Sequence, residues 1–197
     1  MLADSNEIEQ TLTFLRSAER LKTILRSGWT SKGQRESVAE HTWRLCLMAL
    51  VFAERYPDVD FAKLIRICII HDLGEALRGD VPAPAQTTRG DKSREERAGL
   101  VELVASLPPR VRQEIVDLWD EYEAAASQEA KLAKALDKLE TIMQHNQGQN
   151  PADFDYQFNL EYGKQFTEAD PFLAAVRARL DRDTAERVNP SDRASTA

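Results

Sequence analysis

The sequence has little of what marks a disulfide-stabilised, turn-rich or membrane-spanning protein. Its 197 residues include two cysteines, eight glycines and eight prolines, and aromatic residues make up 7%. Cys46 and Cys68 stand alone in apolar stretches, which is typical of small core residues in a reducing compartment. No apolar run is long enough to cross a bilayer, and no secretory signal is recognisable. We therefore expect a cytoplasmic protein.

Positive charge is also scarce, because the formal net charge is −7. Such a surface repels nucleic-acid polymers, so DNA or RNA binding is not expected. Residues 16–35 are the exception, since Glu19 is the only acidic residue there among six basic ones: Arg16, Arg20, Lys22, Arg26, Lys32 and Arg35. This cluster is either a solvated helix face or a site for a small anion, and charge alone favours the solvated face.

The sequence is instead rich in helix-forming residues with helical apolar spacing, which predicts one all-α domain over residues 1–187. Capping boxes at Ser37–Glu40 and Ser93–Glu96 mark two helix starts, Asp60 can cap the helix that follows it, and Ser127 opens a long helix. Helices are predicted at about 5–26, 38–56, 61–73, 93–107, 109–122, 127–143, 155–166 and 171–187. We expect irregular structure from Gly79 to about residue 92, a loop at 144–152 and a disordered tail at 188–197.

Three histidines are the main candidates for chemistry, and two of them lie in apolar surroundings. His71 and Asp72 end an apolar run, where a carboxylate is costly to bury without a compensating cation or donors. One reading is a solvated helix end. The other is a divalent ion bound by His71, Asp72 and His41, with Glu75 facing the same cavity as a general acid or base. His145 falls in the predicted polar loop and is given no role.

These residues resemble the signature of the HD-domain phosphohydrolases, which have a histidine, a His-Asp doublet and a final aspartate on successive helices. The matching positions are His41 in ESVAEHTWR, His71-Asp72 in IIHDLGE and Asp137 in AKALDKLETIM. Within that superfamily, RSGW (26–29), HDLGEALRGDVPAP (71–84) and DEYEAAASQEAKLAKALDKLE (120–140) resemble the 5′-deoxynucleotidases. The resemblance covers about residues 12–145. It implies an HD-domain helical bundle in which the four residues hold one divalent ion, with Mn, Co, Mg, Zn, Fe and Ni as candidates.

The resemblance also implies a reaction and further site residues. It gives Glu75 a role in catalysis and places Asp80 near the metal or its waters. It places Arg26 and Trp29 in the substrate pocket, where the ring would pack on a deoxyribose and exclude a 2′-hydroxyl. Arg26 and Arg35 would hold the phosphate. The expected reaction is hydrolysis of small-molecule deoxyribonucleoside 5′-monophosphates to deoxynucleoside and phosphate.

Other functions remain open on the sequence. Another HD-type phosphomonoesterase or phosphodiesterase would keep the four ligands and change the pocket. A cyclic-dinucleotide phosphodiesterase commonly needs more metal ligands than three histidines offer. A non-catalytic nucleotide-sensing helical module is the third alternative. The resemblance further implies a homodimer, and five aromatic residues either form its interface or close the core: Phe154, Tyr156, Phe158, Phe166 and Phe172.

Overall fold

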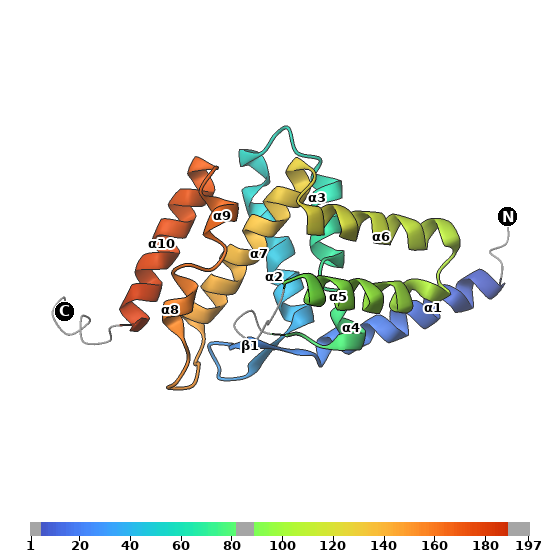
Figure 1. The fold of residues 1–197 in the computed structure, drawn as a ribbon, viewed down its shortest axis with the longest axis horizontal. Helices are drawn as coiled ribbons and strands as arrows, with labels where there is room; N and C mark the ends of the chain where they lie inside the picture. Colours follow the sequence, from blue (N-terminus) through green and yellow to red (C-terminus); the bar gives the residue numbers. More distant parts are fainter. Residues whose placement is uncertain (1–4, 82–88, 189–197) are drawn as a thin grey trace.

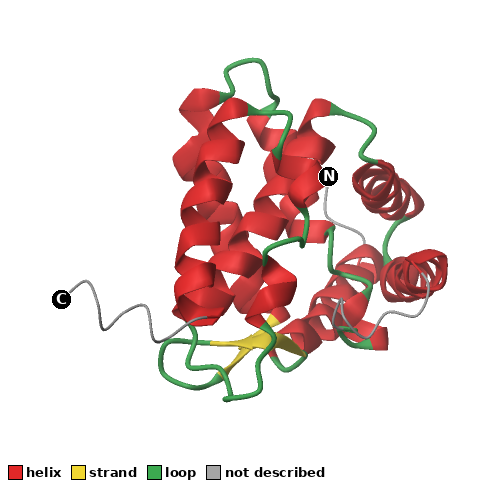
Figure 2. Ribbon diagram, turned by 60° about the vertical axis from the view of Figure 1, so that its left-hand side comes forward, coloured by secondary structure: helices red, strands yellow, loops and turns green. Residues whose placement is uncertain are grey.

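The computed structural model describes residues 5–81 and 89–188, and helices dominate this part of the chain (Figure 1). They are α1 (Ser5–Ala18), α2 (Val38–Phe52), α3 (Phe61–Ile70), α4 (Glu75–Arg78), α5 (Arg89–Leu103), α6 (Pro109–Ala124), α7 (Gln128–Gln147), α8 (Tyr156–Asn159), α9 (Lys164–Thr167) and α10 (Pro171–Val188). Two short strands, β1 (Leu25–Trp29) and β2 (Arg35–Ser37), form a hairpin at one end of the long helices (Figure 2). The prediction of a single all-α domain is confirmed. The domain limits at 1–187 stay a prediction, and residues 189–197 of the predicted tail lie outside the described residues.

Helix α7 is the centre of the fold and packs against α2, α3, α6, α9 and α10 (Figure 1). The Ser127 side chain caps it by accepting from the backbone N–H of Ala130. Leu136 and Leu139 are fully buried along it. Each such side chain contributes about 1.5–3 kcal/mol by leaving water, so this helix fixes the core that the other helices share.

The starts of α2 and α3 confirm the predicted caps. Ser37 and Glu40 form a complete capping box at the start of α2, which places His41 in its first turns. Asp60 caps α3 by accepting from the backbone N–H of Lys63. Because α3 ends at Ile70, the chain turns at His71, and side chains that would diverge on a regular helix can approach one another.

The prediction of one helix over residues 5–26 is wrong beyond Ala18. A 3-10 turn over Glu19–Lys22 follows α1, and the chain then forms β1, which pairs antiparallel with β2. Gly28 lies in that strand instead of ending a helix, and a Cβ there would lie 3.1 Å from the ring of His145. Packing of the hairpin against α7 therefore overrides the local helical spacing.

Other helix limits were also predicted wrongly, because the helix predicted at 61–73 ends at Ile70 and the one predicted at 155–166 is two short helices, α8 and α9. Helix α5 begins at Arg89, so Ser93 lies inside it and is not its cap. Residues 82–88 of the segment predicted to be irregular lie outside the described residues. Helix α7 continues through the predicted loop to Gln147, with His145 and Asn146 buried. These polar residues stay helical because the C-terminal segment supplies partners, Asn159 for His145 and the carbonyl of Leu180 for Asn146.

Candidate functional site

Four ionisable side chains from three separate segments meet beneath the hairpin. His41 comes from α2, His71 and Asp72 from the turn after α3, and Asp137 from α7. His41 Nε2 lies 3.3 Å from Asp137 Oδ1 and 3.8 Å from Asp72 Oδ2, and His71 Nε2 lies 3.1 Å from the same Asp72 oxygen. His41, His71 and Asp137 each offer one ligand atom within 4.8 Å of the others. All four predicted metal ligands are thus neighbours.

The two imidazoles are oriented so that their Nε2 atoms face this cluster. His71 Nδ1–H donates to the carbonyl of Cys68 at 2.8 Å, and His41 Nδ1 is bonded to the Glu140 carboxylate. Both Nε2 atoms are buried without a hydrogen-bond partner among the described residues. Imidazoles held at Nδ1 by a carbonyl or carboxylate are typical of metal ligands. The orphaned nitrogens and the adjacent carboxylates fit a divalent metal ion.

The electrostatics of the cluster favour a cation. Burial raises the pKa of Asp137, but Lys138 and the two histidines outweigh it and hold this pKa well below its usual range. Burial and Arg26 lower the pKa of His41, yet Glu140 and Asp137 raise it to about 9. A site that draws a proton onto a fully buried imidazole has excess negative charge, and a divalent ion would neutralise it.

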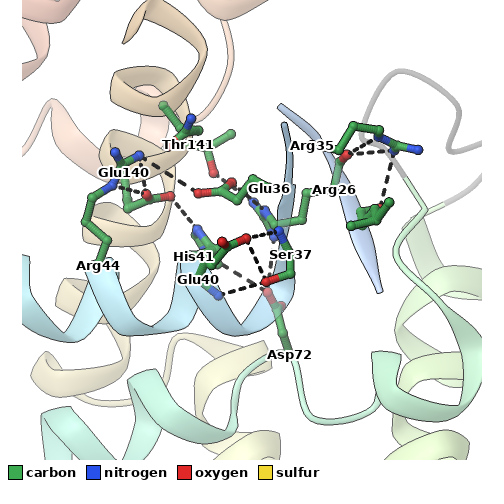
Figure 3. A network of polar contacts seen from close by, with 12 residues as sticks. Arg26, Arg35, Glu36, Ser37, Glu40, His41, Arg44, Asp72, Glu140 and Thr141 are labelled. Atoms are coloured by element: carbon green, nitrogen blue, oxygen red, sulfur yellow. Dashed lines mark hydrogen bonds and ion pairs between the residues drawn. The ribbon is translucent and has the colours of Figure 1, made fainter. Parts of the chain in front are cut away.

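A second group of charged side chains lies around His41 and includes Glu36, Arg44 and Glu140 (Figure 3). Arg44 Nε donates to Glu140 Oε1 at 2.6 Å, and Arg26 Nε lies 3.5 Å from Glu36 Oε2. Burial and the neighbouring Glu140 raise the pKa of Glu36 to about 7. Sequence reasoning gave Glu36 and Glu140 no role. A role for Glu140 could have been predicted from its position three residues after Asp137, which places both side chains on the same face of α7.

Arg26 connects the hairpin to the cluster. Its Nη1 donates to Asp72 Oδ2 at 3.2 Å and its Nη2 to the Thr141 hydroxyl at 3.1 Å. The guanidinium therefore lies beside the candidate ligands. Its position in β1 allows this, because the strand packs against α7.

A cavity of about 150 Å³ opens beside the cluster. Arg26, Asp72 and Asp137 line one part of it, together with both predicted catalytic residues, Glu75 and Asp80. Glu75 is 2% exposed, and its Oε2 has no hydrogen-bond partner among the described residues. Burial, Asp72 and Asp80 raise the pKa of Glu75 well above its usual range, which keeps a proton available beside the cluster.

Two residues predicted to bind substrate do not line this cavity. The Arg35 guanidinium lies 5.5 Å from the centre of the Trp29 ring, and Arg35 Nη2 donates to the Arg26 carbonyl at 2.6 Å. The two residues are paired across the β1–β2 hairpin. Their roles in binding stay predictions.

The C-terminal aromatic residues lie in two different parts of the structure. Phe154 and Phe158 line the cavity, whereas Phe166 and Phe172 pack against the core. His145 also lines the cavity from α7, although sequence reasoning placed it in a loop and gave it no role. Its place in the cavity was missed because α7 was predicted to end near residue 143 and in fact runs to Gln147.

Comparisons with known proteins identify a matching family model, similar chains and a similar fold. The family model described as HD domain matches residues 18–176. The chain is 36% identical over 135 residues to 5′-deoxynucleotidase HDDC2 of Bos taurus. The match covers 68% of this chain and 65% of that relative's length. It is 36% identical over 141 residues to the protein of that name in Dictyostelium discoideum, covering 68% and 74% of the two chains. A crystal structure described as a predicted metal-dependent phosphohydrolase of Magnetospirillum magnetotacticum MS-1 superposes with a TM-score of 0.80 at 28% identity, over 92% and 94% of the chains.

Proposed function

The chain belongs to the HD domain family, and we propose on that premise that it removes the 5′-phosphate from deoxyribonucleoside 5′-monophosphates in a metal-dependent hydrolysis. The observation that supports this best is the pair of buried imidazole nitrogens, His41 Nε2 and His71 Nε2, which make no hydrogen bond among the described residues and lie among carboxylates next to a cavity. The names of the curated relatives support the reaction and its substrate class.

His41, His71, Asp72 and Asp137 would hold the ion. Two imidazoles and two carboxylates suit Mn, Co, Fe, Ni, Zn or Mg. A divalent ion supplies Lewis acidity towards water and neutralises charge on phosphoryl oxygens. The protein keeps the donor atoms ready, because Cys68 and Glu140 fix the two ring orientations.

Glu75 is the proposed proton donor or acceptor of the reaction. Its carboxyl group is buried and lies in the cavity wall, and burial and the neighbouring carboxylates raise its pKa well above the usual range, which favours the protonated form. Asp80 lines the same wall and helps to raise that pKa. Arg26 would stabilise the phosphoryl group, since its guanidinium already binds Asp72 beside the cluster.

The alternatives differ in what they need from the cavity. A nucleotide-sensing module needs a bound nucleotide but no buried proton donor, so the environment of Glu75 favours an enzyme. Another HD-type phosphomonoesterase or phosphodiesterase would use the same ligands with a different substrate. The substrates that the protein hydrolyses distinguish these enzymes from a 5′-deoxynucleotidase.

The test is phosphate release from a panel of deoxy- and ribonucleoside 5′-monophosphates with Mn, Co, Mg or Zn added. We expect release from the deoxynucleotides, with the ribonucleotides slower. The variant Glu75→Gln should lose about 10²–10⁴-fold in kcat. Inactivity of the wild type towards all monophosphates with every metal would refute the proposal.

We also propose that the protein is a homodimer that associates through α2. Four apolar residues form an outward stripe at helical spacing, and they are 42–67% exposed: Trp43, Leu47, Leu50 and Val51. Contiguous exposed apolar side chains on one helix suit a protein–protein interface. Sedimentation should give the mass of two chains, with Leu50→Glu shifting it to one and the matched Val101→Glu on α5 leaving it unchanged. A monomeric wild type would refute this.

No helix in the described residues is long and apolar enough to cross a membrane. The cytoplasmic location stays a prediction.

A further inference from the structure

The cavity extends along α7 well beyond the metal cluster. Asp137, Thr141 and His145 all line it, and their four-residue spacing places them on one face of the helix. From Asp137 to His145 the helix rises by about 12 Å. A phosphate group near Asp137 and Arg26 occupies only the first part of this length. The remainder, at His145, is left for the rest of a substrate.

His145 is a neutral side chain with a fixed orientation. It is 7% exposed, and burial lowers its pKa to about 4. Its Nδ1–H donates to Asn159 Oδ1 at 3.0 Å, and the ring of Phe154 packs edge-on against it with 4.8 Å between centres. This end of the cavity therefore carries no formal charge at His145, unlike the metal end.

Asn159 has an unused hydrogen-bond donor in the cavity wall. The residue is 0% exposed, and its Nδ2 has no hydrogen-bond partner among the described residues. Because a buried donor without a partner is unfavourable, a position of this kind requires an explanation, and a ligand that brings an acceptor would satisfy it.

The segment that carries Asn159 is held in place by α10. Arg177, which is 4% exposed, donates from Nη2 to the carbonyls of Asn159 and Leu160 at 2.8 and 2.9 Å, and from Nη1 to the carbonyl of Tyr162 at 2.6 Å. These bonds fix the backbone on both sides of the unused donor. The donor thus belongs to a preorganised wall.

We propose that this end of the cavity binds the nucleobase of the substrate, with the Asn159 amide donating to the acceptor that lies beside the glycosidic bond. The inference rests on the proposed function. Phe154, Phe158 and Tyr162 provide aromatic surface for a flat ring. Purines carry N3 and pyrimidines O2 at the equivalent position, so one donor serves every base. The subsite selects nucleotides over other phosphate esters without choosing among bases.

Substrate analogues test the proposal in the wild-type protein. 3-Deaza-2′-deoxyadenosine 5′-monophosphate lacks the acceptor, whereas the 7-deaza analogue keeps it and is the matched control. We expect KM to rise about tenfold for the 3-deaza analogue and to stay within about twofold for the control, with kcat little changed, because one buried hydrogen bond is lost. Equal KM values for the two analogues would overturn it. So would a rise in KM only for the 2′,3′-dideoxy analogue, which would assign the donor to the 3′-hydroxyl.

Variants test the same contact from the protein side. Asn159→Asp replaces the donor by an acceptor, and Asn146→Asp makes the same change on α7 at a residue that binds the Leu180 carbonyl instead. Asn159→Asp should raise KM for 2′-deoxyadenosine 5′-monophosphate about tenfold and leave KM for 2-deoxyribose 5-phosphate unchanged. Asn146→Asp should not alter the ratio of the two KM values. Equal effects of Asn159→Asp on both substrates would contradict the subsite, and if the variant does not fold, the analogue series decides.

Binding of the product separates this proposal from the proposed function. Calorimetry of 2′-deoxyadenosine with the wild type needs no turnover. Binding of 2′-deoxyadenosine that is about tenfold weaker with 3-deaza-2′-deoxyadenosine supports the subsite even in a protein that hydrolyses no monophosphate. Absence of such binding in an active enzyme refutes the subsite alone.

Discussion

At the scale of single residues, His41 depends on a partner far away in the sequence. Its Nδ1 is bonded to Glu140, and Arg44 holds the other carboxylate oxygen of Glu140 at 2.6 Å. The Glu140 carboxylate therefore fixes both the tautomer and the ring orientation that turn His41 Nε2 towards Asp137. In metal sites, loss of such a partner typically lowers ion affinity by about 10- to 100-fold.

The first prediction concerns this partner. Glu140→Gln should weaken binding of Mn²⁺ about 10- to 100-fold, because the amide cannot hold the imidazole with a charged acceptor. Calorimetric titration of the metal-stripped protein measures the affinity. Glu114→Gln, which removes an exposed carboxylate paired with Arg66, is the control and should bind as the wild type does. Unchanged affinity in Glu140→Gln would show that Glu140 does not support the site.

The second prediction follows from the buried neutral His145. Its pKa of about 4 lies below the usual 6.5, so between these pH values the unfolded chain binds a proton that the folded chain does not. The free energy of unfolding therefore falls as the pH is lowered, by up to about 3 kcal/mol through this residue. Urea unfolding at pH 7 and pH 4.5 should show a smaller loss in His145→Gln than in the wild type. Parallel losses in both proteins would contradict the assignment.

Only some of the site residues could be predicted from the sequence. His71-Asp72 stood out as charge at the end of an apolar run, and family resemblance added Asp137. Glu140 could not be assigned, because its role depends on contact with His41 across 99 residues. His145 and Asn159 were missed for the same reason, since burial and pairing come from packing of segments distant in sequence.

At the scale of elements, a contact between two backbones positions Glu75. Helix α4 starts next to Gly74, and α5 crosses it so closely that a Cβ on Gly74 would lie 2.2 Å from the carbonyl oxygen of Glu96. A Cβ on Gly99 would lie 2.6 Å from the carbonyl oxygen of Gly74. Glycine at both positions lets α5 cover the turn that carries the proposed proton donor.

The third prediction tests this crossing. Gly74→Ala should lower the free energy of unfolding by about 1–3 kcal/mol and reduce kcat, because the backbones must separate and Glu75 moves with them. Urea denaturation measures the first effect and phosphate release the second. Glu95→Ala, at an exposed position of α5, is the control for a changed side chain on this helix. Wild-type stability of Gly74→Ala would mean that the contact is not tight.

The elements themselves were predictable where local chemistry decides them. The caps at Ser37, Asp60 and Ser127 lie where the sequence placed them. The hairpin and the last turn of α7 were not predictable, because contacts between distant parts of the chain stabilise both. A Cβ on Gly28 would lie 3.1 Å from the ring of His145, and Asn150 Oδ1 accepts from the Trp29 N–H.

At the scale of the whole molecule, the site joins parts of the chain that are distant in sequence. The candidate ligands come from α2, the turn after α3, and α7, while the hairpin supplies Arg26 and the segment around α8 supplies Asn159. An ion that binds the folded chain alone stabilises all of these contacts together.

The role of the metal cluster is tested most directly by phosphate release from 2′-deoxyadenosine 5′-monophosphate by metal-stripped protein before and after a divalent ion is restored, in the wild type and in Asp137→Asn. We expect no release by the stripped wild type, recovery with Mn²⁺ or Co²⁺, and no recovery in a folded Asp137→Asn. Full activity of the stripped protein, or of Asp137→Asn, would contradict that role.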